Sequence, residues 1–199
     1  MSILVGKPAP DFTASAVMPD NTIEPNFNLK NHIRNKIGVL FFYPLNFTYV
    51  CPSEILEFHN YIDRFAEEDA LIIAVSVDSQ FTHLAYKNTP IDQGGIGNVQ
   101  FPMVADLKKT ISRDYDVLMD EAVALRGTFM IDQDFKVRHQ VINDLPLGRN
   151  IEEALRMVKA LKHHQAHGEV CPANWGEGQK GMKATKEGVA EYLAGKYNA

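Results

Sequence analysis

The stretch IGVLFFYPLNFTYVCPSE, residues 37–54, decides the fold of this chain. Its first part, Ile37–Tyr43, is apolar and rich in branched and aromatic residues, and a proline ends it, which predicts a buried strand. Beyond Cys51, apolar residues recur at helical spacing, at Ile55, Phe58, Ile62 and Phe65. The stretch therefore predicts a strand, a loop that ends at a cysteine, and an amphipathic helix.

The position of Cys51 indicates a reactive thiol. Proline is favoured at the first position of a helix, so Pro52 places Cys51 at or beside the N-cap. A sulfur there faces unpaired backbone N–H groups and the positive end of the helix dipole, which favour thiolate over thiol. The alternative is a small buried hydrophobe, a common environment for free cysteine. The reactive interpretation is favoured, because a cysteine that only fills space in the core has no reason to lie at a helix N-terminus.

Length and composition limit the class of protein. A chain of 199 residues is expected to form one domain, or one domain with a functional tail. The net charge is −5 and no basic cluster suggests a nucleic-acid or anionic membrane surface. The longest apolar runs are strand-sized, which argues against a membrane-spanning helix. Two cysteines and no visible secretory signal favour catalytic or redox thiols in a cytoplasmic protein.

Strand and helix patterns alternate along the rest of the chain. Strands are expected at residues 71–77, 128–131 and 135–142, and helices at residues 79–88, 107–115, after Asn150, and at 186–193. This order predicts an α/β sandwich with a mixed sheet. We expect a first domain over residues 1–165 and a polar, glycine-rich tail over residues 166–199.

The turn from the first core strand to a helix is also where thioredoxin-type folds hold their redox cysteines. A dithiol oxidoreductase would carry Cys-x-x-Cys there, but this chain reads Cys51-Pro52-Ser53-Glu54. The other thiol, Cys171, lies in the tail. Any disulfide of Cys51 must form with Cys171 or with another molecule, so disulfide exchange is disfavoured as the primary activity.

Pro44-x-x-x-Thr48-x-x-Cys51, followed by Pro52-Ser53-Glu54, resembles the active site of the peroxiredoxins. Val170-Cys171-Pro172 is similar to the resolving-cysteine segment of their typical two-cysteine class, and residues 6–12, 125–129 and 144–149 also match the family. The resemblance implies a thioredoxin-like fold, with a mixed central sheet flanked by helices and a C-terminal extension. It also implies a thiol-dependent peroxidase that reduces hydrogen peroxide and small organic hydroperoxides without metal, haem or flavin.

The resemblance assigns a role to each residue of the motif. Cys51 is the nucleophile, and Thr48 places its hydroxyl where it can bond both the sulfur and the bound peroxide. Pro44 makes the loop rigid and excludes water. The guanidinium of Arg126 stabilises the thiolate and the leaving oxygen. Each residue also has a plainer interpretation: Thr48 as the cap of a turn, Pro44 as the end of a strand, and Arg126 as a surface charge.

Two further residues are expected to support the site. Glu54 complements the N-terminus of the helix, and the resemblance suggests that it also orients an arginine. Arg149 is the candidate for a second arginine behind the first.

The resemblance further implies a catalytic cycle with two cysteines. Attack on peroxide leaves Cys51 as a sulfenic acid, which condenses with a thiol. The implied thiol is Cys171 of the partner subunit, in a two-fold dimer that assembles further into rings of five dimers. Thioredoxin or a dedicated flavoprotein disulfide reductase would reopen the disulfide. A holdase chaperone and a redox relay to a client protein are the alternatives.

Some positions fit a ligand site or the family pattern less well. His163, His164 and His167 are expected to interact with a helix C-terminus rather than with a metal. Asn46, Tyr49 and Tyr86 stand where many relatives have Asp, Phe and Trp. In relatives, sensitivity to overoxidation goes with a Gly-Gly-Leu-Gly loop and a C-terminal Tyr-Phe pair. Here the corresponding segments are Gly94-Gly95-Ile96-Gly97 and Tyr192-Leu193, which predicts intermediate sensitivity.

Overall fold

The structure, a computed structural model, describes residues 2–197. The chain divides into two compact units, residues 1–154 and 155–199, which are described separately below. The division falls within helix α6 (Ile151–His167). The expected boundary between residues 165 and 166 stays a prediction.

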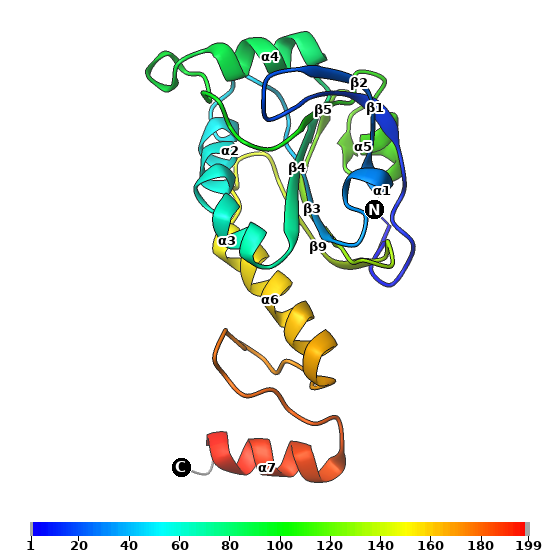
Figure 1. Ribbon diagram of the computed structural model, residues 1–199, viewed down its shortest axis with the longest axis vertical. Coiled ribbons are helices and arrows are strands. Elements are labelled where there is room, and N and C mark those ends of the chain that lie inside the picture. Colours follow the sequence, from blue (N-terminus) through cyan, green and yellow to red (C-terminus); the bar gives the residue numbers. More distant parts are fainter. Residues whose placement is uncertain (1, 198–199) are drawn as a thin grey trace. The chain divides into compact units, whose positions relative to one another are not determined.

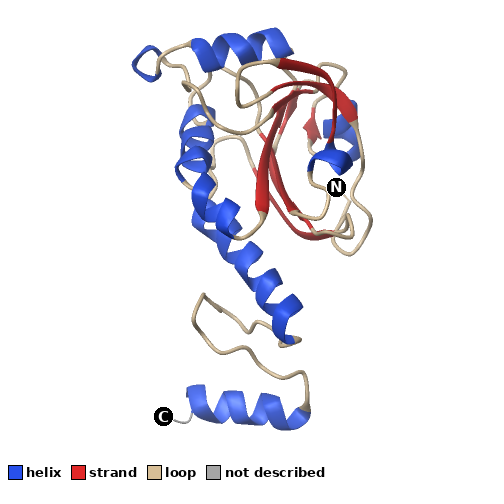
Figure 2. Ribbon diagram, viewed as in Figure 1, coloured by secondary structure: helices blue, strands red, loops and turns tan. Residues whose placement is uncertain are grey.

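The first unit is built on a seven-stranded mixed sheet with the order β2-β1-β5-β4-β3-β8-β9 (Figures 1 and 2). The strands are β1 (Thr13–Val17), β2 (Ile23–Asn28), β3 (Ile37–Phe42), β4 (Ala70–Ser76), β5 (Met103–Ala105), β8 (Arg126–Ile131) and β9 (Val137–Asn143). β3, β4 and β5 are parallel neighbours, and the other neighbouring pairs are antiparallel. The mixed α/β sheet predicted from the element order is confirmed.

Helices cover both faces of this sheet. They are α1 (Leu29–His32), α2 (Cys51–Asn60), α3 (Ile62–Glu67), α4 (Gln80–Asn88) and α5 (Thr110–Asp114), with a 3-10 turn at Ile91–Gln93 and a small ladder of β6 (Leu118–Met119) and β7 (Val123–Ala124). Figure 1 shows the sheet between α2 and α3 on one side and α1 and α5 on the other.

The alternation of side chains along β3 explains this arrangement. Phe41 stacks on Phe58 of α2 with 4.1 Å between ring centroids, whereas the next residue, Phe42, meets Phe129 and Tyr115. Successive side chains of a strand point to opposite faces, so a strand that is apolar throughout must be covered on both. All six residues of β3 are buried, and the strand predicted at residues 37–43 is confirmed to within one residue.

Two predicted caps are confirmed. Ser79 accepts a bond from the backbone N–H of Thr82 at the start of α4 (3.2 Å). Asn150 accepts one from the backbone N–H of Glu153 at the start of α6 (3.1 Å). These local side chain to backbone bonds satisfy N–H groups that the first helical turn leaves unpaired.

Other boundaries differ from the prediction. The apolar pattern after Cys51 spans two helices, because the backbone leaves the helical range at Tyr61. The helix expected at 107–115 is shortened to Thr110–Asp114, and Phe135 lies in the turn before β9 with φ of 61°. The β1–β2 hairpin was not predicted at all, since its short strands lack a clear apolar alternation.

The second unit contains the rest of α6, a long loop and α7 (Lys186–Tyr197). Within it, Val170 and Met182 exchange two backbone hydrogen bonds of 2.9 Å. Trp175 is buried, and its carbonyl accepts a bond of 2.7 Å from Arg156. α7 is four residues longer than predicted and buries none of its residues. Among residues 2–197, no helix is both long and apolar enough to cross a membrane.

Candidate active site

Cys51 is the first residue of α2, directly after the N-cap Val50, with Pro52 in the first turn. This is the position that the sequence predicted. The cysteine is a free thiol and is fully buried. Its sulfur is thus held at a helix N-terminus, away from bulk water.

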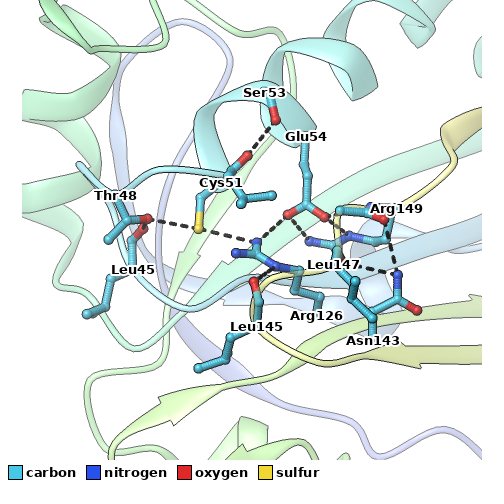
Figure 3. A network of polar contacts seen from close by, with 12 residues as sticks. Leu45, Thr48, Cys51, Ser53, Glu54, Arg126, Asn143, Leu145, Leu147 and Arg149 are labelled. Carbon is cyan, nitrogen blue, oxygen red and sulfur yellow. Dashed lines mark hydrogen bonds and ion pairs between the residues drawn. The ribbon is translucent and has the colours of Figure 1, made fainter.

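Two side chains bond the sulfur (Figure 3). Thr48 Oγ1 lies 3.0 Å from Cys51 Sγ and 2.9 Å from the carbonyl oxygen of Leu45. A threonine hydroxyl has one proton, so it can donate to only one of these acceptors at a time. Arg126 Nη1 lies 3.4 Å from the sulfur and donates to it. A thiolate at this position would therefore accept one hydrogen bond from a hydroxyl and one from a charged guanidinium.

A buried carboxylate joins Arg126 to a second arginine. Glu54 Oε2 accepts from Arg126 Nη1 at 2.6 Å and from Arg149 Nη2 at 2.8 Å. Glu54 Oε1 accepts from Arg149 Nε at 2.9 Å and from the Arg149 backbone N–H at 3.0 Å. The three side chains are 2–4% exposed. Two cations, one carboxylate and one thiolate would balance the charge of this site.

The pKa of Glu54 reflects these contacts. Burial acts to raise the pKa of its carboxyl, but hydrogen bonds from Arg149 and the charges of Arg149 and Arg126 outweigh burial and lower it. Burial lowers the pKa of Arg149, and the bond and charge of Glu54 oppose that shift. The carboxylate form of Glu54 is therefore the one that the site stabilises.

Backbone carbonyls fix the direction of both arginines. Arg126 Nε donates to Leu145 O at 2.7 Å, and Arg149 Nη1 donates to Gly127 O at 2.9 Å. The Arg149 guanidinium also lies over the ring of Phe41, 5.0 Å from its centroid. These contacts leave Nη1 of Arg126 directed at Glu54 and the sulfur, as Figure 3 shows.

The loop between β3 and α2 carries the remaining predicted residue. Pro44 is buried at the end of β3. The loop is also tied down by residues that the sequence did not single out as functional: the Tyr43 hydroxyl bonds Asn46, and Asn46 bonds Asp78 and His83. The departure of Asn46 from the family pattern drew attention to this loop, but nothing in the sequence identified its partners.

The structure thus joins five of the predicted site residues by direct contacts, all in the first unit: Thr48, Cys51, Glu54, Arg126 and Arg149. Pro44, the sixth, is buried in the loop that leads to Cys51. Cys171, the seventh, lies in the second unit, where its thiol donates to the carbonyl of Ala160 at 3.4 Å. Burial raises the pKa of the Cys171 thiol, while the charge of Arg156 opposes this shift. The contacts of Cys171 in the loop after α6 thus favour its thiol form.

The histidines near the end of α6 contact Glu169. His163 Nε2 lies 3.0 Å from the Glu169 carboxylate, and His164 Nδ1 lies 2.8 Å from its backbone oxygen. Within residues 2–197, no group of three or more His, Cys, Asp or Glu side chains is arranged to hold a metal ion.

Comparisons with known proteins extend over nearly the whole chain. A model of the AhpC/TSA family matches residues 5–140, and a model described as the C-terminal domain of 1-Cys peroxiredoxin matches residues 160–195. Alkyl hydroperoxide reductase C of Helicobacter pylori is 58% identical over 191 residues, with 96% of each chain covered. Peroxiredoxin-1 of Gallus gallus is 48% identical, with 96% of this chain and 95% of that protein covered.

A solved structure agrees with this result. The reduced 2-Cys peroxiredoxin of Plasmodium vivax superimposes with a TM-score of 0.94 at 46% identity, covering 97% of this chain and 100% of that one. Sequence identity over nearly the whole chain, together with the buried Cys51 and the arginine that bonds its sulfur, shows the family. The chain belongs to the AhpC/TSA family of peroxiredoxins and is a thiol-dependent peroxidase.

Proposed function

We propose that Cys51 is the peroxidatic nucleophile and that it reduces hydrogen peroxide and small organic hydroperoxides. The observation that carries this proposal is the pair of donors on its buried sulfur, Thr48 Oγ1 at 3.0 Å and Arg126 Nη1 at 3.4 Å. The thiolate attacks one peroxide oxygen, an S–O bond forms and the O–O bond breaks. The sulfur is oxidised to a sulfenic acid, and the other oxygen leaves as hydroxide or alkoxide and takes a proton.

Negative charge moves from sulfur to the leaving oxygen during this step, so fixed donors near both atoms lower the barrier. Arg126 supplies a permanent positive charge at the sulfur. The Thr48 hydroxyl, which has Leu45 O as a second acceptor, can bond the sulfur or a bound peroxide. Pro44 restricts the loop and helps to exclude water. Glu54 and Arg149 position Arg126 without touching the reacting atoms.

The second half of the cycle is proposed to use Cys171. Its sulfur attacks the sulfur of the Cys51 sulfenic acid, so that an S–S bond forms and the S–O bond breaks, and the oxygen leaves as water with the proton of the Cys171 thiol. We propose that Cys171 comes from the partner subunit of a homodimer, with residues 166–199 packing on that subunit and five dimers forming a ring. In support, α7 buries none of its residues in the isolated chain and exposes 47% of Leu193.

Reduction of the disulfide needs a dithiol donor. Thioredoxin and a flavoprotein disulfide reductase are the two candidates, and replacing one by the other in a turnover assay distinguishes them. We place the enzyme in the cytoplasm, because its cycle needs a compartment that keeps thiols reduced.

Steady-state turnover of peroxide with a dithiol reductant tests the central step. The Cys51→Ser variant should have no turnover, because a hydroxyl cannot replace the thiolate as nucleophile. The matched control is Cys171→Ser, which should still consume one equivalent of peroxide in a single turnover. Activity of Cys51→Ser within twofold of wild type would refute the mechanism and would favour a function that does not involve this thiol.

A further inference from the structure

The loop that carries the active-site cysteine contains a strained residue. Phe47 has φ of 54°, in the left-handed region that bulky side chains rarely adopt. It is flanked by Asn46 and Thr48, so its backbone decides where the Thr48 hydroxyl points. A strained residue persists only when its surroundings hold it in place. The residues that hold this loop therefore control the contact between Thr48 and Cys51.

Asn46 is the buried anchor of this loop. Its Oδ1 accepts from the Tyr43 hydroxyl at 2.6 Å, and its Nδ2 lies 3.1 Å from His83 Nδ1. Its backbone N–H donates to the Asp78 carboxylate at 2.9 Å. Asn46 is 6% exposed, so loss of any of these partners would leave a polar group unsatisfied inside the protein.

His83, on α4, connects this anchor to the sheet. Its Nε2 lies 3.1 Å from the backbone oxygen of Val104 in β5. A carbonyl only accepts, so Nε2 carries the hydrogen, and Nδ1 is left to accept from the Asn46 amide. The ring is fully buried, and burial lowers the pKa of His83 to about 4, although the charge of Asp78 opposes this shift. With the neutral imidazole in this tautomer, each hydrogen bond in the series Val104–His83–Asn46–Tyr43 has one donor and one acceptor.

We propose that His83, acting through Asn46, is a positioning residue that holds the strained Cys51 loop in the conformation that reacts with peroxide. His83 touches neither the sulfur nor a substrate, and its effect is transmitted through the loop. The inference rests on the proposed function, because it assumes that the reaction of Cys51 with peroxide is the step that needs this geometry.

The charged and titratable groups around His83 define how protonation would act. They are Tyr43 at the end of β3, Asp78 before α4, and Tyr86 on α4 itself. A proton on Nδ1 would place two donors, the imidazolium and the Asn46 amide, against each other. The bond between the Asn46 amide and Nδ1 would then be lost at acid pH, although Asp78 would partly stabilise the cation.

The test measures the second-order rate of the Cys51 reaction with peroxide by stopped flow, separately from disulfide formation. His83→Leu should lower the first rate by about 10- to 100-fold, as small displacements of reacting groups do, without slowing disulfide formation. His83→Gln should restore most of the rate, because its amide has one donor and one acceptor. Lys87→Met is the control: Lys87 is buried on the same helix but bonds Met18 O at 2.7 Å, away from the loop.

A pH jump in the same instrument separates positioning from a merely structural role. Near pH 4, Asn46→Asp should retain a larger fraction of its own pH 7 rate than wild type does, because its carboxylate can accept a hydrogen bond from protonated His83. This variant also keeps the test decisive if His83→Leu fails to fold. A normal first rate in His83→Leu, or an acid profile of Asn46→Asp identical to wild type, would overturn the inference. A wild-type enzyme whose Cys51 does not react with peroxide would instead overturn the proposed function.

Discussion

Arg126 and Glu54 form an ion pair of 2.6 Å in the interior of the protein, with side chains that are 4% and 2% exposed. The same nitrogen of Arg126 also lies 3.4 Å from the sulfur of Cys51. Buried charges are tolerated only when they are paired and hydrogen-bonded, and Arg149 supplies the second cation of this group. The pair therefore fixes the direction of a charged donor at the sulfur of Cys51.

Replacement of Arg126 by alanine should slow the attack of Cys51 on peroxide by one or more decades. A preorganised charged donor is worth roughly 3 kcal/mol to the transition state, and this is what the variant loses. Stopped-flow measurement of the first step is the direct assay. The control is Arg138→Ala, which removes an arginine that pairs with Asp132. An unchanged rate in Arg126→Ala would remove this residue from the site.

Glu54→Gln should destabilise the fold at neutral pH by about 3–5 kcal/mol, because it leaves two buried arginines without their carboxylate. The pKa of Glu54 is lowered in the folded state, from an ordinary value of 4.5. Its contribution is therefore fully present above that value and is lost as pH falls through the lower, folded-state value.

Urea unfolding of both proteins across this pH range measures the effect. The difference in unfolding free energy between wild type and Glu54→Gln should shrink as the medium becomes acidic. Arg64 and Glu152 form an exposed ion pair, so Glu152→Gln serves as the control and should change stability little. A difference that stays constant with pH would mean that the carboxylate charge of Glu54 does not stabilise the fold.

The connectivity of the disulfide can be read from a non-reducing gel. Wild-type protein treated with one equivalent of peroxide should run as a dimer, whereas Cys171→Ser should run as a monomer. A monomeric band with a Cys51–Cys171 crosslink in the mass spectrum would show resolution within one subunit. That result would preserve the peroxide chemistry and contradict the exchange of tails.

In the proposed cycle, overoxidation is a competition between a second peroxide and Cys171 for the sulfenic acid of Cys51. Leu193 replaces the aromatic residue of sensitive relatives and is 47% exposed on α7, so it is free to pack on another surface. Leu193→Phe should increase sulfinic acid at Cys51, because aromatic packing adds about 0.5–1.5 kcal/mol and slows release of the tail. Truncation before Tyr192 should make the enzyme resistant.

Mass spectrometry of Cys51 across a peroxide series measures both variants. Glu191→Phe is the matched control for Leu193→Phe, because residues two apart lie on nearly opposite sides of a helix. If truncation leaves the amount of sulfinic acid at Cys51 unchanged at every peroxide concentration, the tail does not control access of Cys171 to Cys51.

The sequence alone determined the features that depend on neighbouring residues. These features depend on residues close together in the sequence, so a local pattern is enough to predict them. They are the strand at Ile37–Tyr43, the proline after Cys51, and the helix caps Ser79 and Asn150. The β1–β2 hairpin was missed because Thr13–Val17 consists mostly of small residues, and pairing with β5 in the folded sheet stabilises it.

The contacts of the site were decided by the tertiary structure. Arg126 and Glu54 are 72 positions apart, and no local pattern pointed to their association; the family resemblance suggested only that Glu54 orients an arginine. The antiparallel pairing of Phe41 with Thr128 places the start of β8 beside the end of β3, where the cysteine loop begins. The bond between His83 and Asn46 likewise depends on α4 lying against that loop. Burial is the physical reason: a polar side chain removed from water must find a partner, and only the packed fold determines which one is within reach.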